Sequence, residues 1–188
     1  MPLSQRDKKL LRAKWGEDLI VRLNTDFIPN PILAYSQTVL TFPSPDGAML
    51  ARISPVSRKC LESRIEIRKR SGPAFLRKSY GSADCEHGMG IDQGKWTPDS
   101  MFFVFNTSFS GGHQPWHRPI YFYSRKANKI HSLDSLVGPI VAPEFELTAP
   151  HFVATRALEQ GNSAGRRVMF DLDRSRQRSH RRKRLQTS

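Results

Sequence analysis

The chain has 188 residues, with 30 Lys and Arg against 17 Asp and Glu, and a formal net charge of +13. Its length suits one domain, and 38% hydrophobic and 10% aromatic residues exclude a wholly disordered chain. No run of 18 apolar residues is present, which excludes a membrane-spanning helix, and the charged segment Met1–Arg12 is unlike a secretory signal. We therefore expect a cytoplasmic protein.

The first 31 residues are predicted to form a helix and a linker. Apolar residues recur there at spacings close to 3.6, namely Leu10, Leu11, Trp15, Leu19 and Leu23. Two prolines and an Asn-Pro step within Asn24–Pro31 end the pattern. The apolar stripe is short, which favours packing against the domain, and a basic helix on a membrane surface is the alternative.

From residue 32 to 173 the pattern predicts an all-β domain. The segment Arg64–Arg68 alternates strictly, with Ile65 and Ile67 on one face. The runs Met101–Phe105 and Ile120–Tyr123 are continuously apolar, which suits strands that are covered on both faces. Short strands separated by Gly, Pro, Asn and Asp indicate antiparallel sheets.

An internal repeat organises this domain. Ser44–Gly47, a Ser-Pro-Asp-Gly turn, leads into the apolar strand Met49–Ile53. Thr97–Ser100, a Thr-Pro-Asp-Ser turn, leads into Phe102–Phe105, 53 residues later. Proline presets the backbone of such a turn, the aspartate accepts bonds from neighbouring amides, and glycine tolerates a positive φ. The repeat thus assigns the two aspartates to turns rather than to a pair of catalytic acids.

These residues resemble the repeat of TolB-like and WD40-like β-propellers, whose blades often open with an aromatic residue, Ser or Thr, Pro-Asp-Gly and an apolar strand. The resemblance covers residues 42–79 and 96–133. A closed propeller needs at least four blades of ~40–50 residues, more than this chain can hold. The resemblance therefore implies blade-like antiparallel sheets in an incomplete or open arrangement, with a β-sandwich as the alternative. Open sheet edges would favour association with another chain, including oligomers.

Two polar loops supply the candidate binding residues, because loops on a rigid scaffold often carry function. They are residues 84–90 and 108–119, and the candidates are Glu86, His87, His113, Gln114, Trp116, His117 and Arg118. If the two repeat units stack, a soft-metal set comes together as well, formed by Cys85, His87, His113 and His117. The alternative is two structural loops, with Trp116 packed down as a plug. Cys60 and Cys85 are expected to be reduced thiols, and no cofactor is expected.

A basic segment ends the sequence. It contains seven cations and no acid between residues 174 and 184, namely Arg174, Arg176, Arg178, Arg181, Arg182, Lys183 and Arg184. Such a run has little to bury, so we expect a disordered tail over 174–188. It would contact nucleic acid or another polyanion, or serve as a nuclear-import-like patch at Arg181–Arg184, or remain a solvated tail without a specific role.

These patterns favour a non-enzymatic, propeller-like binding or scaffold module for protein–protein interaction. The first alternative is a nucleic-acid-associated protein that uses the basic tail. The second is a metal-dependent hydrolase that uses the histidine-bearing loops. Motifs of serine hydrolases, zinc proteases and P-loop proteins are absent from the sequence.

Overall fold

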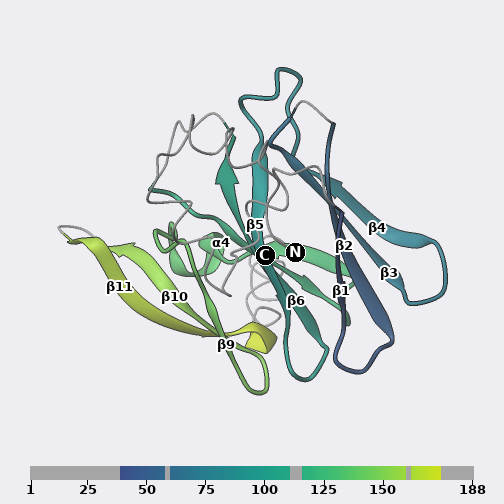
Figure 1. Cartoon of the computed structure of the whole chain (residues 1–188). Coiled ribbons are helices and arrows are strands. Elements are labelled where there is room, and N and C mark those ends of the chain that lie inside the picture. Colours follow the sequence, from purple (N-terminus) through teal and green to yellow (C-terminus); the bar gives the residue numbers. More distant parts are fainter. Residues whose placement is uncertain (1–38, 58–59, 111–115, 160–161, 175–188) are drawn as a thin grey trace, which may run out of the picture.

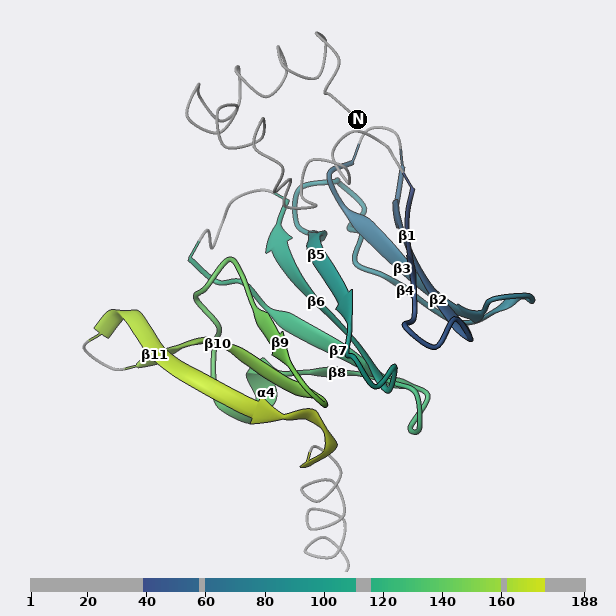
Figure 2. The ribbon, with the colours of Figure 1, turned by 60° about the horizontal axis from the view of Figure 1, so that its bottom comes forward.

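Three antiparallel sheets, which lie side by side, make up the fold (Figures 1 and 2). The computed structural model describes residues 39–57, 60–110, 116–159 and 162–174. The second sheet lies between the first and the third in both views (Figures 1 and 2). The prediction of a mainly β chain with antiparallel sheets is therefore confirmed, whereas the helix predicted within residues 1–31 lies outside the described residues.

Each sheet follows the order of its strands in the sequence. The first sheet comprises β1 (Leu40–Pro43), β2 (Met49–Pro55), β3 (Ser63–Lys69) and β4 (Ala74–Ser79). The second comprises β5 (Met89–Trp96), β6 (Phe102–Phe109), β7 (Ile120–Ser124) and β8 (Lys129–Ser132), and the third comprises β9 (Glu146–Thr148), β10 (Phe152–Glu159) and β11 (Asn162–Asp171). A short helix α4 (Asp134–Val137) follows β8, and a 3-10 turn η1 (Leu172–Arg174) follows β11.

The strand β6 sits at the centre of the molecule and is covered on both faces. Phe103 and Phe105 belong to the core between the first and second sheets, together with Ile65 and Ile67 of β3. Phe102 and Val104 belong to a second core, which is shared with the third sheet. This two-sided burial explains why β6 is continuously apolar and β3 alternates.

The two turns of the repeat have the same hydrogen-bond geometry. In the first turn, the Met49 amide donates to Ser44 Oγ at 2.9 Å and the Ala48 amide to Asp46 Oδ1 at 3.1 Å. In the second turn, residues 97–102, the corresponding bonds measure 3.1 and 3.0 Å. Gly47 (φ +68°) and Ser100 (φ +60°) occupy the same left-handed position. The prediction that both aspartates are turn residues is confirmed.

Each of these aspartates also bonds to the following unit. The Asp46 carboxylate accepts from Arg125, in the turn between β7 and β8. The hydrogen bonds from Ser44 and Arg125 hold the pKa of Asp46 well below its ordinary value. In the second unit, Asp99 Oδ2 lies 2.9 Å from Nδ1 of His151, which precedes β10. Both turn aspartates of the repeat therefore link neighbouring sheets as well as closing their own turns.

The third sheet is a shortened version of the other two. Its strand β10 begins at Phe152, 50 residues after β6 begins at Phe102, so it continues the spacing of the repeat. In the first and second sheets the third strand pairs with a fourth. Within the described ranges, β11 pairs with β10 alone, and its other edge has no strand beside it. The described part of the chain thus ends on an open edge ten residues long.

Candidate functional site

The two loops selected from the sequence meet at one end of the second sheet. Ser110, directly after β6, donates its amide to the Gly88 carbonyl at 3.0 Å. Its hydroxyl lies 3.2 Å from the same carbonyl oxygen and 3.0 Å from Glu62 Oε1. The two loops meet at this contact, because Gly88 belongs to one and Ser110 to the other, and it is the pairing of β5 with β6 within one sheet that brings them together.

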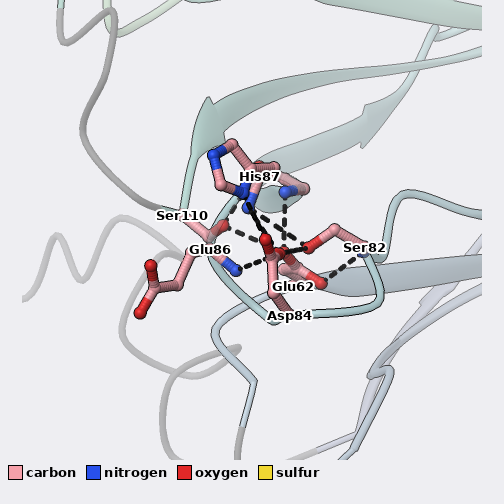
Figure 3. A network of polar contacts seen from close by, with 7 residues as sticks. Glu62, Ser82, Asp84, Glu86, His87 and Ser110 are labelled. Carbon is pink, nitrogen blue, oxygen red and sulfur yellow. Dashed lines mark hydrogen bonds and ion pairs between the residues drawn. The ribbon is translucent and has the colours of Figure 1, made fainter.

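Glu62, directly before β3, is the centre of this contact (Figure 3). None of its surface is exposed. Its carboxylate accepts from the Ser82 amide at 2.6 Å, the Gly88 amide at 2.7 Å and the hydroxyls of Ser82 and Ser110. Burial by itself raises the pKa of Glu62, but these hydrogen bonds outweigh burial and hold the pKa below its ordinary value. Glu62 therefore stays ionised and ties three segments together.

The loop that contacts Glu62, residues 82–88, has its own carboxylate, Asp84 (Figure 3). Asp84 accepts from the Glu86 amide at 3.0 Å and from the amide and ring of His87. Its Oδ1 also lies 2.8 Å from the Ser82 hydroxyl oxygen, whose one proton Asp84 shares with Glu62. These bonds lower the pKa of Asp84, the Glu86 amide contributing most. The predicted binding residue His87 is thus held by Asp84, while the side chain of Glu86 points away from the network (Figure 3).

Cys60 and Cys85 form a disulfide, so the expectation of reduced thiols is wrong. Their Cα atoms lie 5.0 Å apart, within the range that a disulfide spans. The partners are 25 residues apart in the sequence, and only the fold of the first sheet brings the segment before β3 against the loop before β5. The disulfide clamps the same loop that Glu62 holds by hydrogen bonds.

The disulfide also removes Cys85 from the predicted metal set. A thiolate is the form that binds a metal, and the bridged sulfur is not a thiolate. A different group, Cys60, Glu62 and Cys85, has its potential ligand atoms within 4.8 Å of one another. Its sulfurs are bonded to each other and the Glu62 oxygens accept four hydrogen bonds, so these residues form a structural clamp.

Trp116 projects from the second loop and is half exposed, at 50%. The alternative in which it packs down as a plug is therefore wrong. Its ring stacks on His117 with centroids 5.3 Å apart, and His117 also contacts Phe109 at 6.0 Å. His117 Nε2 lies 2.6 Å from Asp134 Oδ1, at the start of α4. The exposed indole thus rests on a ring that a carboxylate holds in place.

Arg118, the next predicted residue, turns inward to a buried acid. Its Nη1 lies 3.3 Å from Asp92 Oδ2, and the Ser108 hydroxyl donates to Asp92 Oδ1 at 2.8 Å. Asp92 is the extra residue of a β-bulge, since Ile91 pairs with Thr107 and Gln93 pairs with Asn106. Burial raises the pKa of Asp92 to about 6, against smaller lowering effects of Ser108 and Arg118.

Replacing Asp92 with asparagine should therefore change the pH dependence of stability. An aspartate in the unfolded chain has a pKa of about 3.9, so the folded protein holds the Asp92 proton more tightly than the unfolded chain does. The free energy of unfolding therefore decreases as the pH rises from about 4 to about 6. We expect Asp92→Asn to be more stable than wild type by roughly 1–3 kcal/mol at neutral pH and equal to it near pH 4. Urea denaturation at both pH values measures this, with the exposed Glu144→Gln as the control. Equal destabilisation at both pH values would contradict the expectation.

Glu62 and Asp92 were not predicted from the sequence. Glu62 stands alone before a strand, and its donors come from two other segments, the loop 82–88 and Ser110. Asp92 lies in a strand whose bulge has no clear sequence signature. A usable signal was Gly88, since a Cβ at that position would clash with the Glu62 carboxyl group and the Tyr80 carbonyl oxygen.

The remaining predicted residues fall largely outside the described ranges. His113 and Gln114 do so, as does the basic segment after Arg174. Arg174 itself lies in η1, with its Nε 3.5 Å from Asp171 Oδ2. Within the described ranges, no helix is both long and apolar enough to cross a membrane.

Comparison of the chain with protein-family models, with curated proteins and with solved structures finds no match.

Proposed function

We propose that this protein is a non-enzymatic, propeller-like binding module that recognises another protein through the loop end of its second sheet. The proposal is carried by one observation, the half-exposed Trp116 of the second loop, which is stacked on His117, a ring held by Asp134. Tryptophan is enriched among the residues that contribute most to protein interfaces, because it buries a large area and loses little side-chain entropy.

Anchoring of the loops supports the proposal. The disulfide, the Glu62 hydrogen bonds and the pair of His117 with Asp134 all restrain segments at this end of the sheet. A surface ordered before binding loses less conformational entropy when a partner docks. The carboxylates at the loop end are bonded to hydroxyls, amides and imidazoles of the protein, an arrangement that suits support of the loops better than acid–base catalysis.

The shape of the chain supports a scaffold role as well. Three blade-like sheets in sequence, each linked to the next, present a row of loops at their ends (Figure 2). The open edge of β11 offers a second contact for a strand of another chain.

Replacing Trp116 with alanine should weaken partner binding by at least about 30-fold, the loss expected for a central aromatic residue. Partners captured on the immobilised protein would be identified, and their affinity measured for wild type and Trp116→Ala. Phe75→Ala is the matched control, because Phe75 is an exposed aromatic residue (43%) on β4 of the first sheet. Equal affinity of Trp116→Ala and wild type for every captured partner would exclude this loop end as the recognition surface.

A further inference from the structure

The outer face of the first sheet is strongly basic. The side chains of β3 that face away from the core are Arg64, Glu66 and Arg68, because Ile65 and Ile67 point inward. Strand pairing places Arg52 of β2 and Arg77 of β4 beside Glu66 on this face. Four arginines thus surround a single acid. We call this set, formed by Arg52, Arg64, Glu66, Arg68 and Arg77, the arginine face.

The charges of the arginine face are not balanced from within. Glu66 is shared by Arg52 at 3.3 Å and Arg77 at 3.1 Å. Among the described residues, no carboxylate lies within ion-pair distance of Arg64 or Arg68. Arg64 Nε donates to Ser54 Oγ at 3.1 Å, and the buried Nε of Arg68 has no hydrogen-bond partner. Because neither Arg64 nor Arg68 has a carboxylate partner among the described residues, the charge of this face is suited to an anion from outside.

A shallow hollow lies on this face. Its volume is about 400 Å³, and its lining includes Arg52, Ser54, Arg64, Val39 and Val56. Glu66 lines it as well, with its carboxylate paired to Arg52 and Arg77. Guanidinium and hydroxyl groups bind phosphate oxygens, while guanidinium planes and aliphatic groups also pack against bases.

We infer that the arginine face binds single-stranded nucleic acid through its phosphodiester backbone. All four cations of the face are arginines, the side chain that pairs with phosphate in a bidentate manner and also stacks on unpaired bases. The four strands present a continuous sheet face, whereas the major groove of a duplex admits a helix or a two-stranded ribbon. Outside residues 174–184 the chain carries 23 Lys and Arg against 17 Asp and Glu, and this net charge of +6 steers a polyanion toward it. This inference is independent of the proposed protein partner and of the basic segment 174–184.

Binding of a fluorescently labelled oligothymidylate to the full chain, followed by anisotropy over a range of salt concentrations, tests this inference. Arg64→Gln with Arg68→Gln should raise Kd about tenfold at low salt. The slope of log K against log salt should become shallower by about 1.4, since each phosphate contact on a single strand contributes about 0.7. Lys126→Gln with Lys129→Gln, the same loss of charge at the turn after β7, should bind like wild type.

Two further measurements keep the outcome unambiguous. Arg64→Lys with Arg68→Lys keeps the charge and should retain most of the salt dependence, which separates loss of contact from loss of fold. Circular dichroism of each variant checks the fold directly. The inference is overturned if the glutamine variant keeps the wild-type Kd and slope. It is also overturned if a duplex binds more tightly than the single strand, or if polyglutamate competes as well as the oligonucleotide, which would indicate an acidic polypeptide instead.

Discussion

Replacing Glu62 with alanine is expected to lower the free energy of unfolding by about 3 kcal/mol or more, since a buried carboxylate with four donors is removed. The amides of Ser82 and Gly88 and the hydroxyl of Ser110 would then be enclosed without an acceptor. Glu62→Gln keeps the shape but turns an amide toward these donors, so it should be destabilised as well. Urea denaturation at neutral pH measures both effects.

The exposed Glu86→Ala is the matched control, because it removes a carboxylate from the adjoining loop without touching the network. A loss for Glu62→Ala no larger than that of Glu86→Ala would show that the network contributes little. The pH dependence offers a second check. Because the pKa of Glu62 is lowered on folding, its contribution is present above about pH 4.3 and is lost as the pH falls below that value. In the Glu62→Gln variant, the free energy of unfolding should lack the decrease that protonation of Glu62 causes at acid pH.

Removal of the disulfide is expected to cost about 3 kcal/mol, the loop-closure entropy of a bridge between residues 25 positions apart. Cys60→Ser with Cys85→Ser in one chain, or reduction of the wild type, should produce this loss in denaturation experiments. A reductant should leave the serine variant unchanged, which distinguishes the bridge from other effects of the reagent. Identical midpoints for oxidised and reduced wild type would contradict the prediction.

The disulfide and Glu62 should not act independently. Both hold residues 82–88 against the segment before β3. Removing one of them should therefore reduce the stabilisation that the other provides. A double-mutant cycle between Glu62→Gln and the two serine substitutions should give a coupling energy of roughly 0.5–3 kcal/mol. Hydrogen exchange of the Gly88 amide, which donates to Glu62, reports the same coupling at one residue.

The strands were predictable because their patterns reflect burial alone. The alternation of β3 and the continuous apolar run of β6 follow from having one or two covered faces. The repeated turns were predictable because local chemistry determines them, with a hydroxyl and an aspartate two residues apart. The third unit was not recognised, because its turn between β9 and β10, residues 149–151, contains no aspartate.

The site was harder to predict, because its interactions join segments that are distant in the sequence. Ser110 and Glu62 are 48 residues apart, and the disulfide partners are 25 apart. Residue type drew attention to these loops, yet the composition could not show which cysteine or carboxylate faces which loop. The same holds for Arg118, whose partner Asp92 is buried only because a bulge turns it inward.

The open edge of β11 bears on whether copies of this protein associate with one another at high concentration. Arg166 and Arg167 lie at the middle of this ten-residue strand, and both are exposed. If two identical strands paired antiparallel over their full length, Arg166 of each would stand opposite Arg167 of the other. Like charges in that position repel, so the strand resists forming fibres with itself while it remains able to accept a strand that carries acidic side chains.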